Sequence, residues 1–350
     1  MSHPNTTSTP CTVAFASNEN GIAPLSMSIW SLLRHAKEST VYDIRILSEE
    51  ISDSSKKHLH SVVESFGARH KLSFIEMAEF YKNTAQLDNL CGRWPYSTWA
   101  RAFTPKLMPD VQLLLYLDID ILVCDDCHKL FEIDMKNKAA GVVYEADPSP
   151  DAYFRKRLDL PLDIPGYFNA GVLLMNLDVF RQENLTDKML TFARNNADVI
   201  EYPDQDPLNA VLYDKAIKLH PRWNWNDLGT RRLIHRKADS TRTIRTATVK
   251  EAVEASLYPG IIHFCGDYKP WQYDNHHIMS YLYEESVHES GLPGFNLKKG
   301  WTLGLWFKRL SHQIVYLFTW KKIHKLARQL NITGAPESQV SCTDKPKKTQ

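Results

Sequence analysis

Short apolar runs alternate with amphipathic stretches along the N-terminal part of the chain. Four apolar runs predict β-strands: 12–16, 42–49, 71–77 and the run that begins at residue 113. Three stretches between them carry apolar residues at helical spacing and predict helices: 24–36, 52–67 and 97–109. This alternation predicts a parallel, doubly wound α/β sheet flanked by helices, in which ligands bind at the carboxyl ends of the strands.

The pattern continues towards the C-terminal end. Three further apolar runs predict strands: 139–147, 171–180 and the run within 261–271, which ends in a glycine turn. Helices are predicted over 184–196 and over 204–214, where two acidic residues stand in the first turn, the position that the helix dipole favours. These segments together predict one large α/β domain over residues 11–290.

The stretch "LLLYLDIDILVCDD", from Leu113 to Asp126, places two carboxylates inside an apolar run. An ionised carboxylate moved out of water costs several kcal/mol unless it is paired or bound to a metal. If the run is one strand, Asp118 and Asp120 point the same way, and two carboxylates on one face can share one hard cation. The alternative is a turn at the strand end whose acids are solvated.

A second polar group follows the apolar run at residue 261, in "HFCGDYKPW". His263 stands at a predicted strand end, Gly266 lets the backbone approach a ligand closely, and Lys269 is a point positive charge suited to a phosphate. An imidazole added to two carboxylates shifts the metal preference from Mg²⁺ towards Mn²⁺. The alternative for His263 is a core histidine with a satisfied hydrogen bond.

Further polar residues stand beside apolar runs. Asn169 lies in "YFNAGVLLMNLD", and Asp204 and Gln205 lie in "YPDQDPLN". Asn and Asp side chains can hydrogen-bond sugar hydroxyls in a fixed orientation, and Arg101 in "WARAF" suits a phosphate or a ribose. Turn and helix-cap chemistry is the alternative for the first group, and a surface salt bridge is the alternative for Arg101.

Composition narrows the class of protein. The chain has 350 residues, 43% apolar and 24% charged, as in soluble globular proteins, and its net charge of +1 does not favour nucleic-acid binding. The polar N-terminus predicts no signal peptide, and no apolar run is long enough to predict a spanning helix. The six scattered cysteines suit reduced thiols in the cytosol, and "CDDC" at 124–127, with no second pair, favours free thiols over zinc.

The segment 297–330 has a composition of its own, with eight Lys or Arg, no acidic residue, and interleaved aromatic and aliphatic residues. Basic residues with Trp and Leu at near-helical spacing predict basic amphipathic helices that lie in a membrane interface. The alternative is a helical hairpin packed on the domain with its charges solvated. The final stretch, 334–350, predicts disorder.

Six segments, taken in order, resemble the retaining glycosyltransferases of family 8, in particular the bacterial lipopolysaccharide galactosyl- and glucosyltransferases. They are "VAFASNENG", "YSTWARAFTPKLMP", "LLLYLDIDILV", "YFNAGVLLMNL", "YPDQDPLN" and "IIHFCGDYKPW", and they span roughly 12–273. The N-terminal loop departs from the family pattern, which often has acidic residues followed by Asn and an aromatic residue. Here the loop reads Asn18, Glu19, Asn20 and Gly21.

The resemblance implies a GT-A fold, which is a Rossmann-like, mixed and mostly parallel sheet flanked by helices. It also implies a UDP-galactose or UDP-glucose donor and a Mn²⁺ ion, with Mg²⁺ as the alternative. By position it implies Asp118, Asp120 and His263 as metal ligands. It implies donor contacts from Ala16, Asn20, Arg101, Asp118, Ile119, Asn169, Ala170, Asp204, Gln205, Gly266 and Lys269. Catalytic roles fall to Gln205, Asp204 and Lys269. The loop 145–165 is expected to select the acceptor, with Glu145 in contact with it.

These expectations describe a retaining hexosyltransferase that acts on a hydroxyl of a lipopolysaccharide or lipooligosaccharide core. The enzyme is expected in the cytoplasm, on the inner face of the cytoplasmic membrane. Because the amide of Gln205 is a poor nucleophile, attack from the leaving group's own face is expected, with a β-phosphate oxygen taking the proton. The alternatives are a family 8 transferase that acts on a protein or another glycan, and a sugar-nucleotide-binding protein without turnover.

Overall fold

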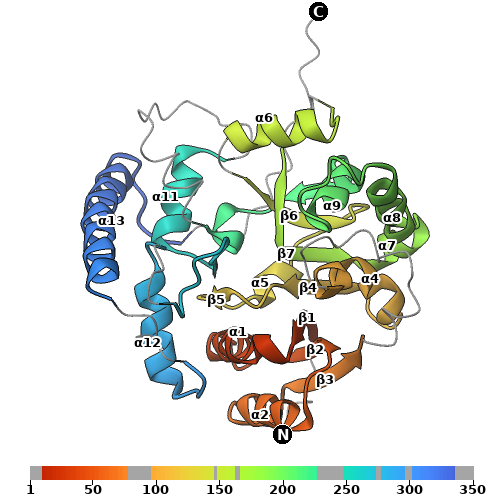
Figure 1. Ribbon diagram of the computed structural model, residues 1–350, viewed down its shortest axis with the longest axis horizontal. Coiled ribbons are helices and arrows are strands. Elements are labelled where there is room, and N and C mark those ends of the chain that lie inside the picture. Colours follow the sequence, from red (N-terminus) through yellow and green to blue (C-terminus); the bar gives the residue numbers. More distant parts are fainter. Residues whose placement is uncertain are drawn as a thin grey trace, which may run out of the picture.

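The computed structural model describes residues 10–77, 96–145, 148–161, 166–226, 247–272, 277–295 and 302–335. Its centre is a seven-stranded sheet in the order β3-β2-β1-β4-β7-β6-β8 (Figure 1). The strands are β1 (Cys11–Asn18), β2 (Tyr42–Glu49), β3 (Lys71–Glu76), β4 (Leu113–Leu117), β6 (Ala140–Tyr144), β7 (Phe168–Asn176) and β8 (Ala216–Lys218). Within this sheet only β7 runs against its neighbours. The predicted α/β architecture, mixed and mostly parallel, is confirmed.

Alternation along the strands gives the sheet one apolar core on each face. In β1, Val13 and Phe15 belong to one core, whereas Ala14 between them belongs to the other. In β4, Leu115 and Leu114 divide in the same way. Strands buried on both faces need apolar residues at every position, which is why these runs are continuous in the sequence.

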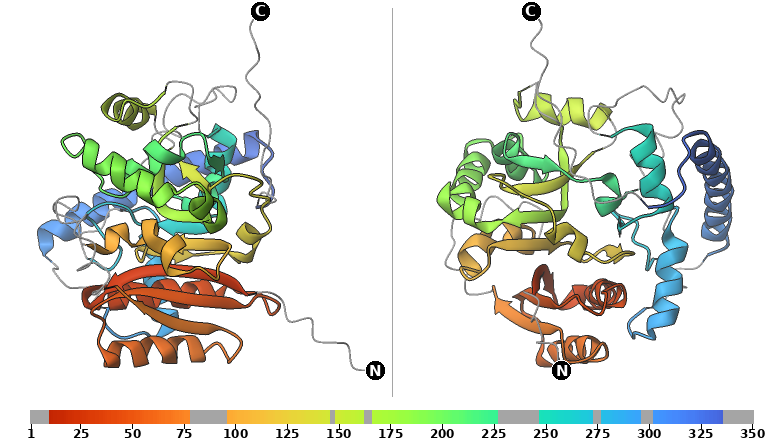
Figure 2. Two further views of the ribbon diagram at one scale, coloured as in Figure 1. Left: turned by 90° about the vertical axis from the view of Figure 1, so that its right-hand side faces the viewer. Right: turned by 180° about the vertical axis from the view of Figure 1, so that it is seen from behind.

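Helices cover the two faces in two groups, visible on opposite sides of the sheet (Figures 1 and 2). The first core is packed by α1 (Ile22–Arg34), α2 (Asp53–Glu64), α5 (His128–Phe131) and α12 (Ser280–Ser290). The second core is packed by α4 (Ala100–Leu107), α7 (Leu177–Gln182), α8 (Leu185–Asn195) and α9 (Gln205–Leu212). Short 3-10 turns, η1 (Glu19–Gly21), η3 (Tyr96–Trp99) and η4 (Pro221–Asn224), lie between the longer elements.

The prediction of one continuous strand through Asp118 and Asp120 is wrong. β4 ends at Leu117, and the chain leaves the large sheet before it re-enters a strand at Ile121. That second strand, β5 (Ile121–Val123), pairs antiparallel with β9 (Ile261–His263) in a separate two-stranded sheet. The apolar run is continuous because both strands are buried, so the break between them is invisible in its composition. The two carboxylates therefore occupy a bend at the carboxyl end of β4.

Two further predictions of secondary structure need correction. The run 171–180 is a strand only as far as Asn176, whose side chain accepts the backbone N–H of Val179 and caps α7. The loop expected over 145–165 contains a helix, α6 (Pro148–Arg157), and residues 146–147 and 162–165 lie outside the described part. The four described cysteines, Cys11, Cys124, Cys127 and Cys265, are free thiols, as predicted.

The C-terminal part adds α11 (Val249–Leu257) and one long helix, α13 (Leu303–Gln329), at the edge of the molecule (Figure 1). Ile323, Leu326 and Ala327 of α13 pack against Val249 and Val253 of α11. Within the described ranges, no helix has the length and apolarity needed to cross a bilayer. The predicted signal-free N-terminus (1–9), the start of the basic segment (297–301) and most of the predicted disordered tail (336–350) lie outside the described residues.

Candidate active site

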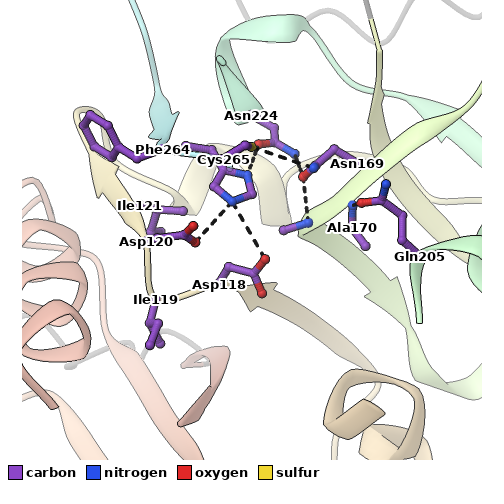
Figure 3. Close-up of polar contacts among 12 residues, drawn as sticks. Asp118, Ile119, Asp120, Ile121, Asn169, Ala170, Gln205, Asn224, Phe264 and Cys265 are labelled. Carbon is purple, nitrogen blue, oxygen red and sulfur yellow. Dashed lines mark hydrogen bonds and ion pairs between the residues drawn. The ribbon is translucent and has the colours of Figure 1, made fainter. Parts of the chain in front are cut away.

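Asp118, Asp120 and His263 converge at the carboxyl end of β4, and in the described chain they form the one group of acidic, His or Cys side chains with metal-ligand spacing (Figure 3). One ligand atom from each lies within 4.8 Å of the other two. The Nε2 atom of His263 lies 3.2 Å from Oδ1 of Asp120 and 3.8 Å from Oδ2 of Asp118. Burial lowers the pKa of His263, but its neighbours Cys265 and Asp120 outweigh burial and hold that pKa well above its usual range.

The imidazole of His263 is oriented from both sides. Its Nδ1 atom lies 2.9 Å from Oδ1 of Asn224, a buried residue of η4. A backbone bridge joins Trp225, the residue after η4, to β9, since the N–H of His263 donates to the carbonyl of Trp225 at 2.9 Å. On the other side Gly171 of β7 has no side chain, and a methyl group there would lie 2.0 Å from Cε1 of the ring.

Arg101 of α4 joins the site to α9. Its guanidinium is buried and holds Asp118 at 2.7 Å and Asp204 at 2.8 Å, and it also donates to the carbonyl of Ala170. Burial raises the pKa of Asp204 to about 6, with Arg101 opposing and Asp118 adding to the rise. The alternative of a surface salt bridge is wrong for Arg101, because 7% of its side chain is exposed. In this structure the guanidinium fixes two carboxylates, and its predicted contact with the donor stays a prediction.

Lys269 reaches the same place from the turn after β9. Its ammonium lies 2.5 Å from Oδ2 of Asp120 and 3.1 Å from the carbonyl oxygen of Phe264. Although burial raises the pKa of Asp120, His263 and Lys269 together hold it well below its usual range. Gly266, at φ +90°, makes the turn that brings Lys269 back, a backbone conformation that glycine adopts without strain.

Asn169 and Gln205 line the β7 side of the site (Figure 3). The Oδ1 atom of Asn169 accepts the N–H of Gly171 and the amide of Asn224, each at 2.9 Å. The Oε1 atom of Gln205, at the start of α9, accepts the N–H of Ala170 at 2.9 Å. Backbone and side chains of this wall therefore form one hydrogen-bonded unit.

The remaining predicted residues are spread around the end of the sheet. Ala16 lies near the end of β1, and Asn20 lies exposed in η1, where its N–H donates to the Asn18 side chain at 3.1 Å. The neighbouring Gly21 admits no side chain without rearrangement, since a methyl group there would lie 2.3 Å from Oγ of Ser17 and 2.8 Å from Cδ1 of Ile119. An aromatic ring at residue 21 would therefore require the side chains of Ser17 and Ile119 to move.

Glu145 directly follows β6, and its N–H donates to the carbonyl of Tyr167 at 2.8 Å. Burial above all, with the charge of Glu145 among the further causes, raises the pKa of the Cys265 thiol beside His263. Glu145 therefore lies near the site, and its contact with an acceptor stays a prediction.

Two residues that hold the site were missed in the sequence. Asn224 orients His263 from a 3-10 turn, and Gly171 makes room for the ring. The turn has no periodicity to mark it, and the requirement at Gly171 comes from a ring that is distant in the sequence. The sequence "FNAG" (168–171) pointed to Asn169 as a polar residue beside an apolar run, but nothing in it pointed to Gly171.

The donor set of Asp118, Asp120 and His263 fits a divalent cation. Carboxylate oxygens suit Mg²⁺ and Mn²⁺, and an added imidazole nitrogen favours Mn²⁺. Without a cation, Asp120 is paired with His263 and Lys269, and Asp118 is paired with Arg101. Because a metal ligand must be a neutral imidazole, binding of a cation would release a proton from His263.

Most of the chain matches one known protein family. The family model described as "Glycosyl transferase family 8" matches residues 12–275. The chain belongs to glycosyltransferase family 8. The predicted resemblance is thereby confirmed, and the Asp118–Asp120–His263 group lies inside the matched region.

This family 8 glycosyltransferase is similar to several named proteins along most of its length. General stress protein A of Bacillus subtilis is 28% identical over 252 residues, 71% of this chain and 82% of that protein. A lipopolysaccharide 1,2-glucosyltransferase of Escherichia coli K12 is 26% identical over 262 residues, 74% of this chain and 72% of that protein. The crystal structure of galactosyltransferase LgtC with donor and acceptor sugar analogues has a TM-score of 0.66 at 21% identity, covering 81% of this chain and 97% of LgtC. That likeness confirms the GT-A fold.

Proposed function

We propose that this glycosyltransferase transfers galactose or glucose from a UDP-sugar, with retention of configuration, to a hydroxyl of a lipopolysaccharide or lipooligosaccharide core. The observation that carries the proposal is the convergence of Asp118, Asp120 and His263 at the carboxyl end of β4, with Lys269 in contact with Asp120. Ligands bind at this end of the strands in open α/β sheets. The names of the Escherichia coli glucosyltransferase and of LgtC support the two hexoses.

The residues of the site match the needs of this reaction. Asp118, Asp120 and His263 would hold Mn²⁺, or alternatively Mg²⁺, which when bound supplies Lewis-acid stabilisation to the departing diphosphate. Lys269 carries a positive charge beside Asp120 and would neutralise charge that grows on the same leaving group. Arg101 keeps Asp118 and Asp204 in place throughout, because its guanidinium is buried and bound to both.

Retention of configuration is proposed to follow from attack on the leaving group's own face. Gln205 presents an amide, a poor nucleophile, and its Oε1 atom is already bound to the N–H of Ala170. A β-phosphate oxygen of the donor would then take the proton of the attacking hydroxyl. The product anomer decides the matter: an α-linkage from an α-linked donor supports retention, and a β-linkage contradicts it.

We place the enzyme at the inner face of the cytoplasmic membrane because of α13. Four exposed apolar side chains, Leu310, Ile314, Leu317 and Phe318, recur at spacings of one helical face. Ile323, Leu326 and Ala327 recur on the opposite face and pack against α11. An exposed apolar stripe on a segment rich in Lys and Arg suits an anionic lipid surface, where a glycolipid acceptor would be found.

Hydrolysis of four donors, UDP-galactose, UDP-glucose, UDP-N-acetylglucosamine and UDP-N-acetylgalactosamine, would test the proposal. Each is incubated with the protein without acceptor, with Mn²⁺, with Mg²⁺ and with a chelator. Metal-dependent hydrolysis of the galactose or the glucose donor supports the proposal and identifies the sugar. Binding of UDP with no release of sugar, even when a lipooligosaccharide core is added, would contradict it and favour a binding protein without turnover.

A further inference from the structure

The side-chain amide of Gln205 is held by two different partners. A backbone N–H can only donate, so the group 2.9 Å from the Ala170 nitrogen must be the Gln205 oxygen. The Gln205 nitrogen then donates to the hydroxyl of Tyr167 at 3.1 Å. Because that hydroxyl accepts from Gln205, its own proton is donated to a different group, which is Oδ1 of Asp206 at 2.6 Å.

Asp206 is fully buried and accepts hydrogen bonds on both oxygens. Arg157 of α6 binds it through two nitrogens, at 2.8 and 2.9 Å. The backbone N–H groups of Glu201 and Tyr202 add bonds of 2.8 and 3.0 Å to Oδ2. A guanidinium and three further donors offset the cost of burying this charge, so Asp206 is a fixed acceptor.

Tyr167 carries the effect of Asp206 to the site. Burial first, and then the charge of Asp206, hold the pKa of the Tyr167 hydroxyl well above its usual range, so the hydroxyl keeps its proton. Its ring stacks on Phe154 at 4.0 Å between centroids, which fixes the ring plane. One chain of hydrogen bonds therefore links Asp206 to Tyr167 and Tyr167 to Gln205, and each donor in it is fixed by the acceptor that it faces.

We infer that Asp206, acting through the Tyr167 hydroxyl, is a positioning residue that sets the orientation of the Gln205 amide towards the donor sugar. The inference rests on the proposed function. The competing interpretation is purely structural, in which the Asp206–Arg157 ion pair only fastens α6 to α9. Tyr167→Phe separates the two, because it removes the hydroxyl and leaves both the ion pair and the ring stacking in place.

The test combines calorimetric binding of UDP and of the preferred UDP-hexose, in Mn²⁺, with turnover. Tyr167→Phe is expected to bind UDP within about twofold of wild type, to lose most of the added affinity that the hexose gives, and to turn over about tenfold more slowly. Tyr144→Phe is the matched control, since the buried Tyr144 hydroxyl has no hydrogen-bond partner in the part of the chain that is described. Asp206→Asn is expected to show the same loss with a lower melting temperature.

A double-mutant cycle shows whether the effect passes through Gln205. In the Gln205→Ala background, Tyr167→Phe is expected to change nothing further. Equal losses in both backgrounds, or wild-type turnover by Tyr167→Phe, would overturn the inference and leave the proposed function intact. Failure of the wild-type protein to bind UDP or any UDP-hexose would overturn the proposed function, and the inference with it.

Discussion

The backbone of Gly171 lies directly against the imidazole of His263. A methyl group on Gly171 would come within 2.0 Å of Cε1 and 2.6 Å of Nδ1 of that ring, and within 2.8 Å of Oδ2 of Asp118. β7 can therefore present no side chain where it passes the end of β4. The space left by that missing side chain is the space in which the ring meets the two carboxylates.

Gly171→Ala is therefore expected to displace His263. Since the methyl group meets a buried ring and a carboxylate, we expect a loss of Mn²⁺ affinity of at least about tenfold, measured by calorimetry. Gly304→Ala in α13 is the control, because a methyl group there meets nothing within 4 Å. Unchanged Mn²⁺ affinity in Gly171→Ala would mean that the imidazole is not a ligand.

Asp120→Asn is expected to abolish most metal-dependent turnover. The substitution removes a charge that faces both His263 and Lys269, and we expect a fall of about a hundredfold or more in donor hydrolysis at fixed Mn²⁺. Asp110→Asn, which loses a surface pair with Arg45 at a site 60% exposed, serves as the control. Near-wild-type hydrolysis by Asp120→Asn would show that Asp120 has no part in the reaction.

Asn224→Ala is expected to weaken metal binding without removing a ligand. The Asn224 oxygen lies 2.9 Å from Nδ1 of His263, and groups that orient a metal-bound imidazole typically contribute about 10–100-fold to affinity. The measurement is a Mn²⁺ titration followed by calorimetry. Asn196→Ala, which loses a hydrogen bond to the carbonyl of Phe192 at a helix end, should titrate as wild type. Equal affinity in the two variants would show that Asn224 has no part in orienting the ring.

Stability is expected to fall in mild acid because of His70. Burial, with the charge of Arg69 adding, lowers the pKa of His70 from 6.5 to about 4. A folded-state pKa below the unfolded value means that this contribution is complete above about pH 6.5. It is lost as the pH falls towards 4, up to about 3 kcal/mol.

Urea unfolding at pH 7 and pH 4.5 measures this loss. The His70→Gln variant keeps an acceptor for the Tyr42 N–H and should lose less stability than wild type between the two values. The variant His60→Gln, at an exposed position, should follow wild type. If His70→Gln and wild type lose the same free energy, another group governs the acid sensitivity.

Membrane attachment is expected to depend on the exposed face of α13. Leu317 and Phe318 are 57% and 65% exposed, and replacing both with Ser should weaken co-sedimentation with anionic vesicles by about tenfold or more. Hydrolysis of the donor in solution should be unaffected. Tyr281→Ser, at an exposed position of α12, is the control. If the wild-type protein does not co-sediment with anionic vesicles at low salt, the proposed location is contradicted.

The convergence of three polar side chains could be predicted from the sequence because polar residues at the ends of apolar runs stand out. Asp118, Asp120 and His263 all have this setting. The break between β4 and β5 was not recoverable, because strands in different sheets are equally apolar when both are buried. Tyr167 and Asp206 were not assigned roles either. The role inferred for them depends on one hydrogen bond between segments 39 residues apart, and no local pattern encodes it.

The pairing of β5 with β9 sets the order in which the site can be completed during synthesis of the chain. Lys269 follows Asp120 by 149 residues, and His263 comes only shortly before Lys269. At about 5–20 residues per second, a ribosome needs about 7–30 seconds to pass from the first two carboxylates to the imidazole. A growing chain thus carries Asp118, Asp120 and Arg101 well before His263 and Lys269 are made. The proposed cation site can therefore be completed only after β8, the last strand of the seven-stranded sheet in the chain, has been synthesised.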